Sequence, residues 1–241
     1  NINSYFKNII FFMNRYGKGL QLLETERWWN SKNILKFDLQ YKKSYRDKNV
    51  VLYQNSRRNT VFNLLDKDLK NKKILEIGFG AGQLLELMLK KKKSNHYYGV
   101  EISHPLLKKT KKRLAKIKNK KLNLSVQNLD KKLKFKDKSF DLIIAVGVLH
   151  YSADIEKALK EINRLLKKNG KFIIAQRSGY SLSYLFGFRY LFRTLIYLFY
   201  KEKYEIFPSF RAIFCDSQLF GKYFKKYEKT KIFNSQFFLK G

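Results

Sequence analysis

Apolar and polar residues recur along the chain with two periods, and these periods predict where strands and helices lie. Short apolar runs predict five strands, at 73–77, 97–101, 122–126, 140–146 and 171–176. Between the strands, apolar residues recur every three or four positions, which predicts helices near 82–91, 104–118 and 153–167. Strand–helix units in this order predict an α/β fold with a parallel sheet covered by helices on both faces.

The segments outside these units have other patterns. Residues 1–70 are predicted to be an N-terminal helical cap region, and residues 71–241 the main domain. Within the main domain, residues 180–200 are rich in aromatic side chains but contain two arginines, which disfavours a membrane span. We interpret this stretch as part of a lid-like insertion at about 178–215. The tail from 228 to 241 is predicted to be a hairpin that turns at Asn234 and Ser235.

The composition narrows the expected compartment and partners. One cysteine and three histidines provide neither a disulfide framework nor a zinc cluster, so we expect a cytoplasmic protein without a metal site. The formal net charge is +33, but Lys, Asn, Ile, Phe and Tyr are enriched along the whole chain, as in proteins of AT-rich genomes. We therefore interpret most of this charge as a solvated outer face. A nucleic-acid partner stays open but is not favoured, and the aromatic stretch leaves open a peripheral contact with the inner face of the membrane.

A glycine-rich turn indicates a ligand site. The stretch "KKILEIGFGAGQLLELM", residues 72–88, places Gly78, Gly80 and Gly82 between a predicted strand and a predicted helix. Such a turn is typical of a site for an anionic or nucleotide-like ligand. A nucleoside triphosphate is excluded because no Lys-Ser or Lys-Thr pair follows Gly82. The dinucleotide fingerprint is not met either, since the sixth position counted from Gly78 is Gln83.

Further features accompany the turn. Glu101 ends the next predicted strand, nineteen residues beyond Gly82, where a carboxylate can accept hydrogen bonds from both hydroxyls of a ribose. Two longer stretches follow, "LKFKDKSFDLIIAVGVLHY" at 133–151 and "ALKEINRLLKKNGKF" at 158–172. Together with the order E-x-G-x-G-x-G in the turn, they resemble the class I S-adenosylmethionine-dependent methyltransferases, and most closely the branch that acts on small molecules and lipid quinones. The resemblance covers residues 72 to about 176, with Lys134 where proline is usual and Lys-Asn-Gly for the familiar Pro-Gly-Gly at 168–170.

The resemblance implies a fold, a cofactor and a reaction. The fold would be a Rossmann-like, doubly wound, mostly parallel seven-stranded sheet with helices on both faces, and the cofactor would be S-adenosyl-L-methionine. The reaction would be methyl transfer to a small-molecule or lipid-like acceptor. A basic RNA methyltransferase and a non-catalytic module that binds S-adenosylmethionine are the alternatives. The first is disfavoured because "GVLHY" stands where amino-group methylases commonly carry Asn/Asp-Pro-Pro-Tyr/Phe.

The resemblance also assigns roles to individual residues. Glu76 would hold the amino group of the methionine moiety, and the backbone at the three glycines and at Gly147 would line the cofactor. Glu101 would bind the ribose. Either Asn128 or Asp130 would read the adenine, and the spacing does not decide between them. The whole predicted cofactor site is therefore Glu76, Gly78, Gly80, Gly82, Glu101, Asn128, Asp130 and Gly147.

Catalysis itself needs few groups, because the methyl donor carries a good leaving group and the protein mainly positions the acceptor. A base is needed only when the acceptor must lose a proton. His150, just after the fourth predicted strand, is the candidate base. A structural hydrogen bond in the turn that follows is an equally good interpretation of this histidine.

Overall fold

The structure is a computed structural model. It describes residues 48–66, 69–92, 94–117, 121–152, 154–177, 223, 224, 228–232 and 236–240, and eleven further single positions between 26 and 46. The aromatic stretch at 180–200 and the lid-like insertion predicted at about 178–215 lie outside the described residues. None of the helices formed by described residues is both long and apolar enough to cross a membrane.

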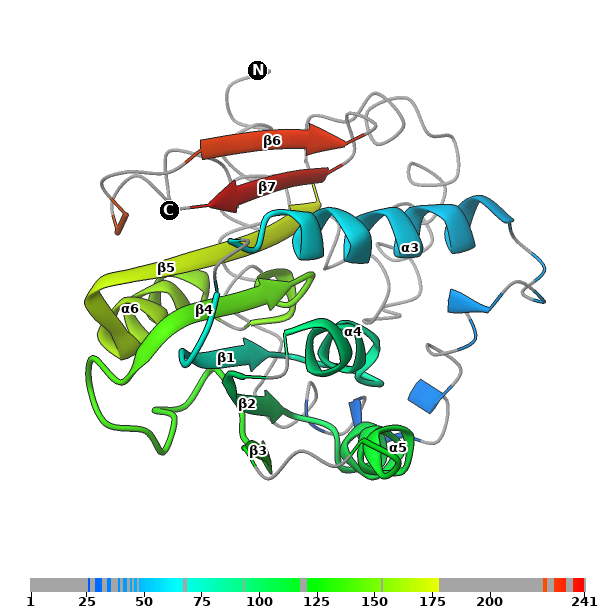
Figure 1. The fold of residues 1–241 in the computed structure, drawn as a ribbon, viewed down its shortest axis with the longest axis horizontal. Coiled ribbons are helices and arrows are strands. Elements are labelled where there is room, and N and C mark those ends of the chain that lie inside the picture. Colours follow the sequence, from blue (N-terminus) through cyan, green and yellow to red (C-terminus); the bar gives the residue numbers. More distant parts are fainter. Residues whose placement is uncertain are drawn as a thin grey trace, which may run out of the picture.

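A sheet forms the centre of the molecule (Figure 1). Its five parallel strands are β1 (Lys73–Ile77), β2 (His96–Glu101), β3 (Leu122–Val126), β4 (Phe140–Val146) and β5 (Leu166–Arg177). Two antiparallel strands, β6 (Glu228–Ile232) and β7 (Gln236–Lys240), extend it, and the order is β3-β2-β1-β4-β5-β7-β6. The strand order reverses between β1 and β4, so the sheet is doubly wound, and ligands of such sheets bind at this point beside the carboxyl ends of the strands.

The alternating side chains of the strands pack into two layers on opposite faces. On one face, Ile143 and Ile174 belong to the same core cluster as the apolar side of α6 (Ile155–Leu165). On the other face, Ile144 and Ile173 share a cluster with α4 (Gln83–Lys91) and with residues of α3 (Lys48–Asn63) and α5 (His104–Leu114). Because neighbouring residues of a strand point to opposite faces, a parallel strand covered on both sides carries a continuous apolar run, as β4 does at 142–146 and β5 does at 172–175.

Local sequence signals set the helix starts. The Ser103 hydroxyl accepts a hydrogen bond from the backbone N–H of Leu106 at 3.3 Å, and Pro105 occupies the first turn of α5. The Asp154 carboxylate likewise caps α6 by accepting from the backbone N–H of Lys157 at 3.0 Å. Elsewhere, the predicted bounds of α4 and of the first four strands agree with the structure within one residue.

Three predicted boundaries were wrong. The helix predicted to 167 ends at Leu165, and β5 begins at Leu166 rather than at 171. Regular pairing of β5 with β4 nevertheless starts at Lys171, because the register shifts between Phe140 and Leu142. The helix predicted at 104–118 ends at Leu114, before a lysine-rich stretch with little apolar surface to bury.

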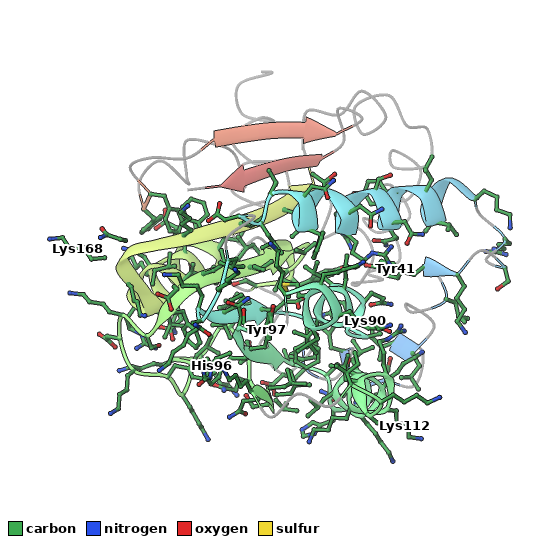
Figure 2. All side chains as sticks on the ribbon, viewed as in Figure 1. Tyr41, Lys90, His96, Tyr97, Lys112 and Lys168 are labelled. Carbon is green, nitrogen blue, oxygen red and sulfur yellow. The ribbon has the colours of Figure 1, made fainter. Side chains whose placement is uncertain are left out.

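The lysine side chains lie mainly on the outside of the domain, and Lys112 and Lys168 in Figure 2 extend away from the sheet.

The predicted hairpin is confirmed in outline, because β6 and β7 pair in antiparallel register.

Candidate functional site

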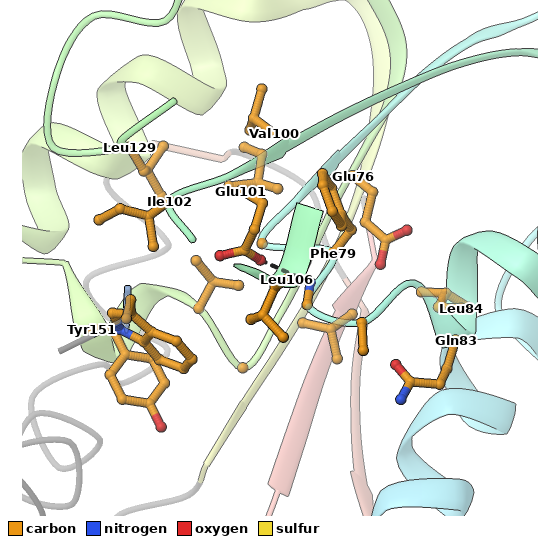
Figure 3. A pocket seen from close by; sticks show the side chains of 18 of the residues that line it. Glu76, Phe79, Gln83, Leu84, Val100, Glu101, Ile102, Leu106, Leu129 and Tyr151 are labelled. Carbon is orange, nitrogen blue, oxygen red and sulfur yellow. Dashed lines mark hydrogen bonds between the residues drawn. The ribbon is translucent and has the colours of Figure 1, made fainter. Parts of the chain in front are cut away.

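A cavity of about 250 Å³ opens at the carboxyl ends of β1, β2 and β4, at the reversal of the strand order. Figure 3 shows its wall, with Glu76 and Glu101 on neighbouring strands and Tyr151 on the opposite side. Most of the predicted cofactor residues line this cavity, namely Glu76, Gly78, Gly80, Glu101, Asn128, Asp130 and Gly147. Residues from four separate segments therefore meet at one site. Gly82 starts α4 and is not part of the wall.

The glycine turn places backbone directly on the cavity. Gly80 has a φ of 56°, in the left-handed region that favours glycine. A Cβ atom added at Gly80 would meet nothing within 4 Å, so this position faces open space where a ligand can approach the backbone closely. At Gly78, by contrast, an added Cβ would lie 2.3 Å from a methyl carbon of Val148. Gly78 therefore allows close packing inside the protein, whereas Gly80 leaves room for a ligand.

Glu101 is fixed by the backbone around it. Its Oε2 accepts a hydrogen bond from the N–H of Gly80 at 2.8 Å, and its Oε1 accepts one from the N–H of Ser103 at 3.1 Å. Burial raises the pKa of the Glu101 carboxyl, and these backbone donors oppose the rise. Each carboxylate oxygen has a further lone pair available. The carboxylate is thus held in one orientation at the cavity wall, and it can accept hydrogen bonds from two adjacent hydroxyls.

Glu76 has no such support. It is 3 % exposed, and its Oε2 is buried without a hydrogen-bond partner. Burial raises the pKa of the Glu76 carboxyl to about 8, and the nearby charge of Glu101 adds to the rise. A buried acid without a donor destabilises the empty protein, so the site is complementary to a ligand that brings a positive hydrogen-bond donor.

The segment after β3 presents both candidates for reading an adenine, and both side chains already have partners. The Asn128 amide donates to Oε1 of Glu26 at 2.9 Å, and its oxygen accepts from the backbone N–H of Asp130 at 2.9 Å. The Asp130 carboxylate accepts a hydrogen bond from the Ser152 hydroxyl. The structure brings both residues to the cavity, and which of them would contact an adenine stays a prediction.

The end of β4 forms the next part of the wall. Gly147 has a φ of 65°, and its N–H donates to the carbonyl of Ala175 at 2.7 Å. The short helix η2 (Leu149–Tyr151) follows and carries His150, whose side chain is not among the described parts. The backbone of His150 lies between cavity residues Val148 and Tyr151, so the predicted base sits in the right segment, and its role stays a prediction.

Sequence reasoning missed the contribution of the first 70 residues to the site. Helix α3 adds Gln54, Arg57 and Arg58 to the cavity wall, and Trp29 stands edge-on to Tyr151 with ring centroids 4.7 Å apart. The available signal was the Arg57-Arg58 dipeptide, which is the only pair of adjacent arginines in this lysine-rich chain.

Known proteins resemble this chain in its central part. Residues 75–174 match the family model described as "Methyltransferase domain". The ubiquinone biosynthesis O-methyltransferase of Pelagibacter ubique is 32 % identical over 133 residues, which is 54 % of this chain and 53 % of that protein. The uncharacterized methyltransferase YdaC of Bacillus subtilis is 32 % identical over 104 residues, 43 % of this chain and 55 % of that protein. The chain thus spans about half the length of the curated relatives that it matches.

Solved structures show the same fold. Magnesium protoporphyrin IX methyltransferase from Synechocystis PCC 6803, solved with bound SAH, superposes with a TM-score of 0.65 at 15 % identity and covers 89 % of this chain and 96 % of that one. A SAM-dependent methyltransferase from Aquifex aeolicus gives a TM-score of 0.51 at 14 % identity, over 76 % and 96 % of the two chains. The family match, the doubly wound sheet and the acid–glycine turn lead to one conclusion: residues 75–174 form a class I S-adenosylmethionine-dependent methyltransferase domain.

Proposed function

We propose that this protein transfers a methyl group from S-adenosyl-L-methionine to a small-molecule or lipid-like acceptor. The observation that carries the proposal is the convergence of Glu76, Gly80 and Glu101 on one cavity at the reversal of the strand order. The cavity offers an unsatisfied acid, an open stretch of glycine backbone and a fixed carboxylate. The unsatisfied acid matches an ammonium, the open glycine backbone allows close approach of a nucleoside, and the fixed carboxylate matches the hydroxyls of a ribose.

The residues present fit the cofactor. Glu76 would accept a hydrogen bond from the ammonium of the methionine moiety, which restores the partner that its Oε2 lacks. One arginine of α3, Arg57 or Arg58, would hold the methionine carboxylate, because both line the same cavity. Glu101 would bind the ribose hydroxyls. When bound, the cofactor supplies an electrophilic methyl group on a sulfonium.

The rest of the site would position the acceptor and keep water out. The Tyr151 ring, packed edge-on against Trp29, forms an aromatic wall on the side facing Glu101 (Figure 3). If the acceptor must lose a proton, His150 is placed in the adjoining segment to receive it. A lipid-like acceptor is supported by the aromatic sequence at 180–200, which we still interpret as a lid.

Methyl-labelled S-adenosylmethionine tests the reaction and the acceptor class together. The full chain is incubated with separate lipid, small-metabolite and RNA extracts, and label is counted in each. We expect label in the lipid or small-metabolite extract, and none with the Glu101→Gln variant. The exposed Glu156 provides the matched control, since Glu156→Gln removes an acid that does not line the cavity and should label normally. Label confined to RNA would refute the acceptor class, and no label in any extract would refute the enzymatic proposal.

A further inference from the structure

Arg57 presents to the cavity a guanidinium that has no carboxylate partner among the described residues. Its NH2 makes one hydrogen bond, to the neutral hydroxyl of Tyr41 at 3.3 Å, and the Nε is buried without a partner. The guanidinium also lies over the ring of Tyr53, with its central carbon 5.9 Å from the ring centroid. These aromatic neighbours fix the position of the guanidinium and leave its charge intact, because guanidinium groups stay protonated in proteins.

The acids of the cavity do not neutralise this charge. Among the described residues, no carboxylate lies within ion-pair distance of Arg57 or of Arg58, and the Arg58 guanidinium donates to the side-chain amide oxygen of Asn59. The three acids of the cavity wall face other groups. Glu101 accepts from two backbone N–H groups, Asp130 accepts from Ser152, and Glu76 is the acid assigned above to the ammonium of the cofactor.

Arg57 lies against the end of β4, beside the segment that carries Val148, His150 and Tyr151. Its NH1 lies 2.8 Å from the position that a Cβ atom on Gly147 would occupy, so the guanidinium rests directly against the end of β4. Gly147 is followed by Val148 and Tyr151 on the same wall, and His150 lies between them in the sequence. A group bound in front of Gly147 therefore lies next to the Arg57 guanidinium.

Within the part of the chain that the structure describes, the cavity wall offers two guanidinium groups, whereas the cofactor brings one carboxylate. Arg57 is the arginine that lies against the end of β4. We propose that Arg57 binds an anionic group of the methyl acceptor, so that the acceptor is an organic acid with a carboxylate close to the methylated atom. Arg58 is then the residue for the methionine carboxylate. This inference rests on the proposed function, since it identifies the acceptor class of the same site.

The inference excludes some acceptors and favours others. A protonated amine beside Arg57 would meet a like charge in a partly buried site, which disfavours it. A carboxylate would form a charge-assisted hydrogen bond with the free face of the guanidinium. An apolar acid satisfies both this contact and the aromatic wall formed by Trp29 and Tyr151.

Matched acid and amide probes test this assignment without knowledge of the natural acceptor. The probes are 4-hydroxybenzoate, 3-phenylpropanoate and dodecanoate, each paired with its primary amide, and their binding to the full chain saturated with S-adenosylhomocysteine is measured by ligand-observed NMR. We expect at least one acid to bind about 10- to 100-fold more tightly than its amide. Arg57→Gln should bring this ratio close to one and change the affinity for S-adenosylhomocysteine by less than about threefold, whereas Arg57→Lys should keep part of the preference.

Two arginine variants complete the comparison. Arg58→Gln should weaken S-adenosylhomocysteine binding and keep the preference for acids, and Arg46→Gln, at an exposed position outside the cavity, should change neither. Three results would each overturn the assignment. They are equal binding of acids and amides, the absence of binding by every probe, and a loss of cofactor affinity in Arg57→Gln as large as in Arg58→Gln. If the wild-type chain fails to bind S-adenosylhomocysteine but still prefers acids through Arg57, the proposed function is wrong and the anion site stands.

Discussion

The buried carboxyl of Glu76 should make cofactor binding depend on pH. In the structure, burial and the charge of Glu101 raise the pKa of Glu76 to about 8, so the empty site holds this acid protonated at neutral pH. The ammonium of the cofactor favours the charged carboxylate instead. Binding below pH 8 must therefore remove one proton from Glu76.

The size of the effect follows from that pKa. Below pH 8, each unit of pH costs about 1.4 kcal/mol of binding free energy, so affinity should rise about tenfold per unit as pH increases. Binding of S-adenosylhomocysteine should thus be about 50-fold weaker at pH 6 than at pH 8, because half of the Glu76 carboxyl is ionised at pH 8. Above pH 8 the rise should stop, because the Glu76 carboxyl is then already ionised in the empty site.

Calorimetry can measure both the affinity and the proton. Titrations at pH 6, 7 and 8 in buffers with different ionisation enthalpies should give release of about one proton per cofactor at the lower pH values. Glu76→Gln should bind more weakly at pH 8 and show a flat profile from pH 6 to 8. The cofactor-free wild type should also lose stability as pH rises through about 8, because a raised pKa of Glu76 stabilises the fold only while the proton is bound. The Glu76→Gln variant should not show this loss of stability. A flat wild-type affinity profile with no proton release would show that Glu76 does not face the ammonium.

Three other predictions concern single positions. Glu101→Ala should weaken S-adenosylhomocysteine binding by about 2–3 kcal/mol, or 30- to 150-fold, in calorimetry, since two charge-assisted hydrogen bonds are lost; an unchanged dissociation constant in a folded variant would reject the ribose role. Gly80→Ala should weaken the same binding with a small loss of thermal stability, whereas Gly78→Ala should lower the stability by about 1–3 kcal/mol through the contact with Val148. The opposite pattern would contradict the assignment of Gly80 to the ligand and of Gly78 to packing inside the protein. His150→Ala should lower turnover by about 10²–10⁴ without changing cofactor affinity if the acceptor loses a proton, and full activity would return His150 to a structural role.

The central sheet could be predicted from the sequence because its inner strands, such as β1 and β4, are buried on both faces. Strand β4 is apolar at almost every position, and turn residues or a capping acid separate it along the sequence from the elements before and after it. The cofactor residues were predictable for a related reason. Glu76, Gly80 and Glu101 occupy fixed places at strand ends, and parallel strands bring these ends to one edge without any long-range information.

The N-terminal contribution could not be predicted in the same way. The Glu26 carboxylate meets the Asn128 amide across 102 residues of sequence, and no local period records such a contact. Helix α3 was expected only as a part of the cap that leads to the glycine turn, because its apolar residues do not form one clear stripe. Its arginines become interpretable only after the fold places them beside Gly147.

The positive charge of the chain and the charges of the cavity have different consequences. The lysines of α5, such as Lys111 and Lys112, are exposed on the outer face, where they attract anions without selecting among them. The cavity wall instead carries three acids and two arginines, in positions set by the strands and by α3. A polyanion such as RNA could gain from the lysines, but inside the cavity it would meet Glu76 and Glu101. A small acid can leave these carboxylates to the cofactor and use one arginine. The arrangement of charge inside the cavity, rather than the total of +33, therefore favours a small acceptor.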